Sequence, residues 1–250
     1  MLNRAELKQE AKAVNRAARV SPYIFALIFL LITFVLSTVD AYVSGDVVAN
    51  LQKNAPWLPI PAFLTQASYP PTVAAFVSVV VSLLGFVLEA GWCLYLLGVR
   101  RGEKMEYGTL FDGFSFAGKL IALNLVMIIF ITLWSMLFVI PGIIAAYRYR
   151  FAVLNLCENP ELGVMEALNM SKAQTSGYKG QLFMLDLSFL GWAILCGATM
   201  GILAIWVMPY FSQTNVGYFE QIKRAKGIGY FPEQHGNGRF RDGNSFDPER

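Results

Sequence analysis

Four long apolar stretches constrain the fold of this chain more than any other feature of its sequence. They cover residues 22–39, 72–99, 120–147 and 182–211, and only Glu89 and Asp186 bring charge into them. A helix needs about 20 mainly apolar residues to cross the hydrocarbon core of a bilayer. The first stretch is just long enough for one span, and the other three are longer. Backbone groups in lipid must be satisfied within the segment, so the sequence predicts an all-α, polytopic transmembrane helical bundle.

Composition supports a membrane protein and excludes several other classes. Hydrophobic residues make up 56% of the chain and charged residues 15%, whereas soluble domains average about 45–50% and about 25%. This apolar excess excludes a disordered chain. The three cysteines include no C-x-x-C pair, which excludes a disulfide-rich secreted scaffold. A net charge of only +3 argues against nucleic acid as a partner.

Basic residues set the expected orientation, because cytoplasmic loops are enriched in Lys and Arg. The N-terminal segment is basic, residues 40–71 contain Lys53 as their only base, and residues 100–119 are basic again. We therefore predict a multi-pass protein of the cell membrane with an external loop at 40–71. Both the N-terminus and the C-terminus are expected in the cytoplasm.

The number of passes depends on whether the third and fourth stretches turn back within the membrane. If 120–147 crosses only once, the basic residues that follow it lie outside. Turns at Pro141–Gly142 and near Gly197 leave only Lys53 outside. We therefore predict six membrane-crossing helices, with four as the alternative. The short legs that such turns produce are the argument against six.

Two further helices are expected in the plane of the membrane on its cytoplasmic side. Residues 3–19 place an apolar face among basic residues, which is typical of a helix on an anionic membrane or of a topogenic signal. Asn159–Pro160 is a helix-start signal and predicts a helix at 160–173. The predicted organisation is an N-terminal amphipathic helix, a transmembrane bundle and a disordered cytoplasmic tail, at residues 1–21, 22–222 and 223–250.

Four charged residues within or beside the apolar stretches are the candidate functional residues. Glu89 lies near the middle of its stretch, where a carboxylate is costly unless it faces the bundle interior or a cavity. It is either a proton or cation relay or a substrate counter-charge, or it makes an internal hydrogen bond or a pair with Arg148 or Arg150. Asp186 is expected to form a structural pair or a helix-start interaction. The two arginines are expected to snorkel to the membrane surface or to bind lipid phosphate.

Four further residues are candidates for structural turns or packing. Pro141 and Gly142 form the predicted turn of the third stretch. Gly197 and Gly201 have the GxxxG spacing, which permits close helix approach or simply marks a bend.

Catalytic motifs are absent from the sequence. The only histidine is His235, and no phosphate-binding loop, His-Glu-x-x-His or Gly-x-Ser-x-Gly motif is present. We therefore expect no enzyme, no catalytic residue, no cofactor and no metal site.

Several short motifs are spread over residues 1–222. The most specific is the segment Leu182–Trp192, which reads LFMLDLSFLGW. The others are Arg4-x-x-Leu7-Lys8, Arg101–Glu103, Phe111–Phe114, Ile140–Ile144 with Tyr147 and Tyr149, Asn159–Pro160 with Glu166–Leu168 and Ser171, and Pro209–Tyr210. Together they resemble a bacterial integral-membrane family known as domain of unknown function nine-seven-five. The resemblance implies a shared architecture that includes the Pro141–Gly142 turn and Asp186, but it supplies no reaction or ligand.

These features favour a non-enzymatic integral membrane protein that binds or stabilises other membrane components. Its expected partners are membrane lipids, another membrane protein or a second copy of the chain. The alternative is transport of a small molecule or lipid that uses the intramembrane Glu89. An intramembrane enzyme ranks third, because the chain has one histidine and no paired carboxylates.

Overall fold

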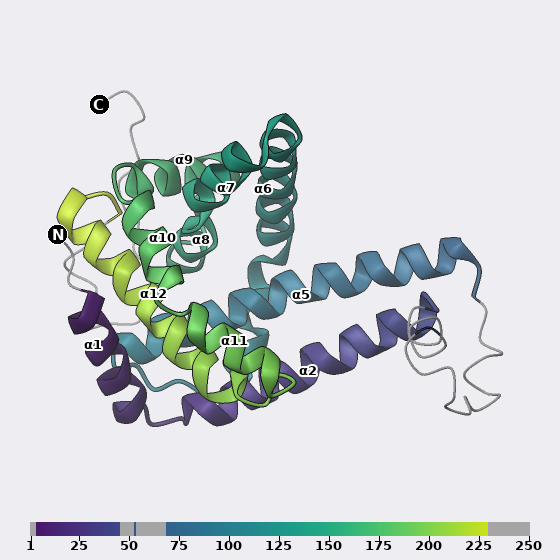
Figure 1. The fold of residues 1–250 in the computed structure, drawn as a ribbon, viewed down its shortest axis with the longest axis horizontal. Coiled ribbons are helices and arrows are strands. Elements are labelled where there is room, and N and C mark those ends of the chain that lie inside the picture. The colour runs from purple at the N-terminus through teal and green to yellow at the C-terminus, as the bar shows by residue number, and fades with distance from the viewer. Residues whose placement is uncertain (1–3, 46–52, 54–68, 230–250) are drawn as a thin grey trace.

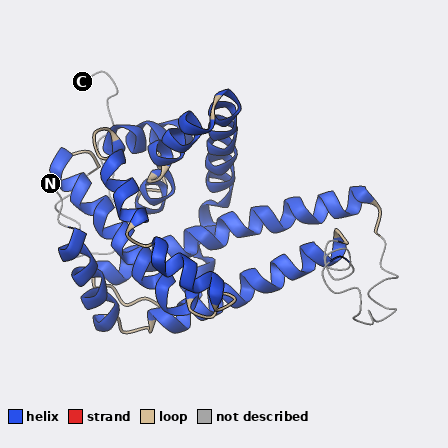
Figure 2. Cartoon of the chain, in the orientation of Figure 1, coloured by secondary structure: helices blue, strands red, loops and turns tan. Residues whose placement is uncertain are grey.

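The computed structural model describes residues 4–45, 53 and 69–229. Over these residues the chain folds into helices joined by short turns, which confirms the predicted all-α class (Figures 1 and 2). The elements are α1 (Arg4–Ala17), α2 (Pro22–Val43), α5 (Pro71–Arg100), the 3₁₀ helix η1 (Tyr107–Phe116), α6 (Ala117–Leu137), α7 (Val139–Tyr149), α8 (Ala152–Glu158), α9 (Val164–Thr175), α10 (Lys179–Leu187), α11 (Leu190–Ala198) and α12 (Ala204–Lys226).

Within the described ranges, four helical segments are long and apolar enough to cross a membrane. They are Pro22–Val43, Pro71–Arg101, Tyr107–Leu137 and Lys179–Ala198. The third unites η1 with α6, and the fourth unites α10 with α11. Large apolar side chains cover their outer faces, for example Phe76, which is 70% exposed. Such surfaces suit lipid rather than water, so the helices indicate a membrane protein.

The first two spans pack side by side as an antiparallel pair (Figure 1). Each begins with proline in its first turn, where the missing N–H costs no hydrogen bond. Phe25 of α2 stacks on Tyr95 of α5 with ring centroids 3.8 Å apart. The Tyr95 hydroxyl also donates a hydrogen bond of 2.9 Å to the carbonyl oxygen of Val20. These contacts anchor α2 to the inner end of α5.

The third apolar stretch turns back on itself as a hairpin of α6 and α7 (Figure 1). The reversal occurs at Phe138, between Leu137 and Val139, and not at Pro141–Gly142 as predicted. Pro141 instead lies in the first turn of α7, where proline is tolerated. Gly142 brings the two helices together, since a Cβ on it would lie 2.9 Å from the Cα of Ser135.

The fourth apolar stretch also reverses, between the end of α11 and the start of α12. Gly201 has a φ of +87° and Met200 a φ of +49°, the left-handed conformation that a tight turn requires. A Cβ on Gly197 or Gly201 would meet no atom within 4 Å. The GxxxG spacing therefore marks a bend here and not a close contact between helices.

The length of α7, the helix that returns after the reversal of the third stretch, bears on the number of passes. α7 has 11 residues, so at ~1.5 Å per residue it extends roughly 16 Å, against a hydrocarbon core of about 30 Å. The six predicted spans are therefore not confirmed, and the alternative of four is consistent with the structure.

Both predicted in-plane segments contain helices, with altered bounds. α1 lies within the predicted 3–19, and its apolar face packs on α12 and α5, where Leu7 is fully buried. The helix predicted at 160–173 begins later, at Val164, because Asn159 forms a turn and its side-chain oxygen accepts a 3.2 Å hydrogen bond from the Glu161 N–H. α12 continues to Lys226, so the predicted tail begins inside a helix, and residues 230–250 lie outside the described residues.

Charged side chains join the inner ends of the helices. Glu158 of α8 accepts a hydrogen bond of 2.6 Å from Arg101 after α5 and also pairs with Lys223 of α12. Arg100 bridges Glu220 of α12, at 2.7 Å, and Glu10 of α1. The end of α5 is thereby tied to three other helices around one core.

Candidate functional site

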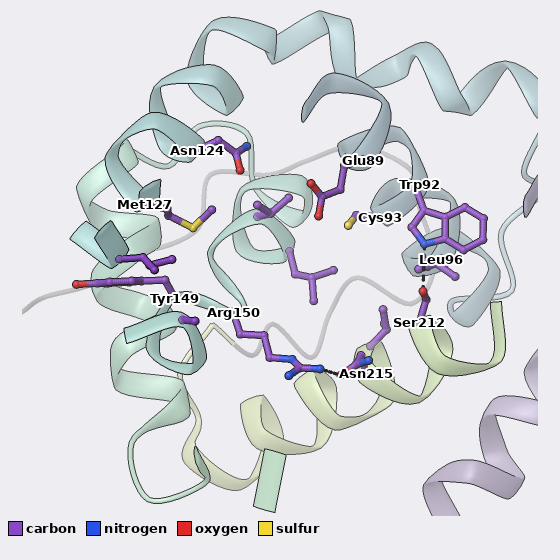
Figure 3. A pocket seen from close by; sticks show the side chains of 15 residues that line it. Glu89, Trp92, Cys93, Leu96, Asn124, Met127, Tyr149, Arg150, Ser212 and Asn215 are labelled. Carbon is purple, nitrogen blue, oxygen red and sulfur yellow. Dashed lines mark hydrogen bonds between the residues drawn. The ribbon is translucent and has the colours of Figure 1, made fainter. Parts of the chain in front are cut away.

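A cavity of about 290 Å³ lies between α5, α6, α7, α8 and α12. Figure 3 shows the side chains that converge on it from these helices. Six of the lining residues are polar or charged: Glu89, Asn124, Tyr149, Arg150, Ser212 and Asn215. The rest of the lining is mostly apolar, which is the usual composition of a small-molecule site.

Glu89 points into this cavity from the middle of α5 (Figure 3). Its side chain is exposed to the cavity space, whereas its neighbours Leu88 and Ala90 are buried. Among the described residues, no hydrogen bond or ion pair to Glu89 is found, and the predicted pair with Arg148 or Arg150 does not form. The bundle therefore holds a carboxylate that faces an open space without a protein partner.

Arg150 is instead held by Asp186, which explains why it does not reach Glu89. Nη1 of Arg150 donates to Oδ2 of Asp186 at 2.5 Å, and Nη2 donates to Oδ1 at 2.8 Å. Nη2 also donates to Oδ1 of Asn215 at 2.6 Å, and the Tyr147 hydroxyl donates to Oδ2 of Asp186 at 2.7 Å. A bidentate pair of this kind has fixed geometry as well as strength. The network joins α7, α10 and α12 at one wall of the cavity.

The two arginines thus have different positions. Arg150 lines the cavity, and its charge is matched by Asp186. Arg148 is not part of the lining, but its carbonyl oxygen accepts hydrogen bonds from the hydroxyls of Ser171, at 2.9 Å, and Thr175, at 3.3 Å. This backbone contact fastens α9 to α7.

The remaining polar groups keep some hydrogen-bonding capacity toward the cavity. The Asn124 amide nitrogen donates to the Leu120 carbonyl at 3.0 Å, which leaves its side-chain oxygen as an acceptor. The Ser212 hydroxyl accepts from Nε1 of Trp92 at 3.2 Å, which leaves its proton to donate. The cavity therefore offers one carboxyl group without a partner among the described residues, an amide acceptor and a hydroxyl.

Sequence reasoning identified Glu89, Asp186 and Arg150 as candidates but missed Asn124, Ser212 and Asn215. Asn124 carried a usable signal, because it is an amide within an otherwise apolar stretch. The other two residues follow the last apolar stretch, and only the return of α12 brings them to the cavity. In the described part of the chain, no group of three or more His, Cys, Asp or Glu side chains is placed to hold a metal ion.

Replacing Asp186 with asparagine tests the network at the cavity wall. We expect Asp186→Asn to cost roughly 2 kcal/mol, because it weakens hydrogen bonds to a charged group and leaves Arg150 without its counter-charge. The measurement is the thermal melting temperature in detergent. Asp112→Asn, at an exposed position of η1, is the control and should melt like the wild type. Equal melting of both variants would contradict a structural role for Asp186.

The long apolar helices indicate a polytopic helical membrane protein. Residues 135–226 match a protein family described as "Protein of unknown function (DUF975)". The predicted family resemblance is thereby confirmed for this part of the chain, which runs from α6 to the end of α12 and includes Arg150 and Asp186. The motifs quoted before residue 135 lie outside the matched region. Neither the curated proteins nor the solved structures contain a match to this chain.

Proposed function

We propose that this chain is a non-enzymatic integral membrane protein that binds a small amphipathic component of the membrane in the cavity at Glu89. One observation carries the proposal, namely a carboxylate without a protein partner that faces a cavity of about 290 Å³ within the bundle. An unmatched charge at membrane depth is expensive, and such residues usually mark a site where something binds or passes.

The charge of the cavity indicates the chemistry of the ligand. Arg150 is matched by Asp186, so it does not neutralise Glu89. A ligand that carries a protonated amine, or another strong hydrogen-bond donor, would compensate this carboxylate. Anionic ligands are disfavoured because Glu89 would repel them.

The size of the cavity limits the ligand further. A volume of about 290 Å³ lies at the lower end of the roughly 300–1,000 Å³ typical of small-molecule sites. It suits a small amphipathic amine or the amine headgroup of a lipid, but not a whole phospholipid. Apolar lining residues such as Leu96, Met127 and Val153 would surround the apolar part of the ligand.

The packing of the two ends of the chain supports the proposed orientation in the cell membrane. α1 contacts α12 along its length, so the N-terminal helix and the end of α12 lie on the same side of the bundle (Figure 1). The basic residues of both ends favour a cytoplasmic location for that side. The reversals at Phe138 and Gly201 support six passes, because each returns the chain toward this side.

Binding of octylamine tests the proposed function, because this probe carries a protonated amine on a short apolar chain. Trp92 lines the cavity, so tryptophan fluorescence of the purified protein should report the binding. We expect Glu89→Gln to weaken octylamine binding roughly 10- to 100-fold, the usual contribution of a charge-assisted hydrogen bond. Octanol should bind both proteins equally.

The matched control is Glu103→Gln, which removes the same charge from an exposed position outside the cavity. It should bind octylamine like the wild type. A wild-type protein that binds octylamine no better than octanol, or a Glu89→Gln variant that binds it unchanged, would contradict the proposal.

Transport is the second candidate, and the unpaired state of Glu89 favours it. A carboxylate without a fixed partner can take up and release a proton or a cation, which a paired one does poorly. In proteoliposomes, a proton-linked amine flux that Glu89→Gln abolishes and Glu103→Gln preserves would establish transport. Octylamine binding without such a flux would support the binding function and contradict transport.

A further inference from the structure

Helix α1 has two chemically different flanks on either side of its buried apolar row. Arg4, Lys8 and Lys12 follow one another at intervals of four residues, so they lie on one flank. Glu10 lies on the opposite flank, where it pairs with Arg100 of α5. The helix is therefore oriented with its acidic flank toward α5 and its basic flank toward α10, α11 and α12.

The basic flank rests on aromatic side chains at the break between α10 and α11. The Nζ atom of Lys8 lies 4.3 Å from the ring centroid of Phe189 and 3.5 Å from the carbonyl oxygen of Ser188. The Nζ atom of Lys12 lies 5.3 Å from the ring centroid of Tyr210, which belongs to α12. Contacts of a cation with an aromatic face hold the ammonium group in place without neutralising its charge.

Among the described residues, no acidic group pairs with this set of cations. Nη1 of Arg4 is 3.4 Å from the carbonyl oxygen of Met184, and in the described ranges neither Arg4 nor the two lysines form an ion pair. Burial and the nearby charges of Arg4 and Lys12 lower the pKa of Lys8 from its ordinary value. The three side chains are thus close enough to repel one another, and an anion between them would be stabilised.

An uncharged apolar surface begins where the basic flank ends. No charged residue occurs between Asp186 and Glu220 in the sequence. On α10 and α11 beside Phe189, the side chains of Leu187 and Leu190 are about half exposed, at 48% and 52%. A row of cations at the edge of exposed apolar surface is the arrangement found at the level of lipid phosphates.

We propose that Arg4, Lys8 and Lys12 bind the phosphate of an anionic phospholipid, whose acyl chains lie against Leu187 and Leu190. Lysine and arginine bind phosphate through charge-assisted hydrogen bonds. The lipid is favoured over free phosphate because the adjoining apolar surface stabilises acyl chains and contributes nothing to a small anion. This site is separate from the cavity at Glu89 and does not depend on the function proposed for it.

Native mass spectrometry of the full-length protein, with phosphatidylglycerol or phosphatidylcholine added in detergent, tests the site. The wild type should retain more phosphatidylglycerol than phosphatidylcholine. An anionic membrane surface contributes roughly a fivefold gain in binding per basic residue, so the double variant K8Q/K12Q should bind phosphatidylglycerol roughly 25-fold more weakly. Binding of phosphatidylcholine should not change.

Two further variants distinguish this site from general electrostatics and from misfolding. K104Q/K172Q removes the same charge from exposed positions outside α1 and should retain the preference for phosphatidylglycerol. Lys12→Gln alone changes one exposed side chain, which leaves the fold intact, and should lose roughly fivefold.

Three results would overturn the proposal. The first is an equal loss in K8Q/K12Q and K104Q/K172Q, which would indicate diffuse attraction. The second is a wild-type protein without preference for phosphatidylglycerol. The third is inorganic phosphate that binds as tightly as the lipid and with the same dependence on Lys8 and Lys12, which would make this a site for the free anion.

Discussion

Gly91→Ala is expected to lower the melting temperature of the protein in detergent by about 10 °C, because overpacking of this kind costs roughly 3 kcal/mol. Gly91 lies where α5 crosses η1. A Cβ on Gly91 would overlap the carbonyl oxygen of Leu110 and would lie 2.5 Å from the carbonyl carbon of the same residue. Both atoms belong to the backbone, so no side-chain rotation relieves the clash and the two elements must move apart.

The reverse side of the same contact also depends on glycine. A Cβ on Gly113 of η1 would lie 2.5 Å from the carbonyl oxygen of Val87 in α5. Separation of α5 from η1 would shift α5 and with it Glu89, so ligand binding should fall together with stability.

Gly85→Ala is the matched control, because Gly85 belongs to the same helix and a Cβ there would meet no atom within 4 Å. Alanine has the higher helix propensity, so this variant should melt at or slightly above the wild-type temperature. Similar melting of Gly91→Ala and Gly85→Ala would show that α5 and η1 do not approach each other as described.

Glu158→Gln is expected to destabilise the protein by roughly 3 kcal/mol, because it leaves buried positive charge without a counter-charge. The carboxylate of Glu158 pairs with both Arg101 and Lys223, and its side chain is only 11% exposed. Removal of the shared anion leaves two cations facing each other at the junction of α5, α8 and α12. The measurement is again the melting temperature in detergent, with a drop of about 10 °C.

A second substitution shows whether uncompensated positive charge causes the loss of stability. Lys223→Met in the Glu158→Gln background removes one of the two uncompensated cations and should restore part of the lost stability. Glu161→Gln, at an exposed position nearby, should have no effect. A double variant that is less stable than Glu158→Gln alone would contradict the electrostatic explanation.

Much of the secondary structure was predictable because hydropathy acts locally. The first two apolar stretches became α2 and α5 within a few residues of their predicted ends. The reversal of the third stretch was predicted from the distribution of Lys and Arg. Its predicted position, Pro141–Gly142, lies C-terminal to the observed turn. Proline was taken as the turn, whereas it stabilises the start of the returning helix and Phe138 makes the turn.

The partners of the charged residues were not predictable in the same way. The sequence placed Glu89, Asp186 and Arg150 in or beside the bundle, but it did not distinguish which acid holds the arginine. That choice depends on how α7, α10 and α12 approach one another, and these helices are separated by long segments of chain. The glycine contact between α5 and η1 was missed for the same reason, since Gly91 looks like any other small residue in an apolar run.

The sequence by itself determined that the chain is helical, that its long apolar segments suit a membrane, and that a lone acid stands in the second of them. These properties follow from composition along short windows, because transfer of a segment into lipid depends on its own side chains. Only the tertiary structure decided that Asp186 takes Arg150 while Glu89 is left facing a cavity. Pairing depends on distance in space, and only the packed bundle sets the distances between charges that lie far apart along the chain.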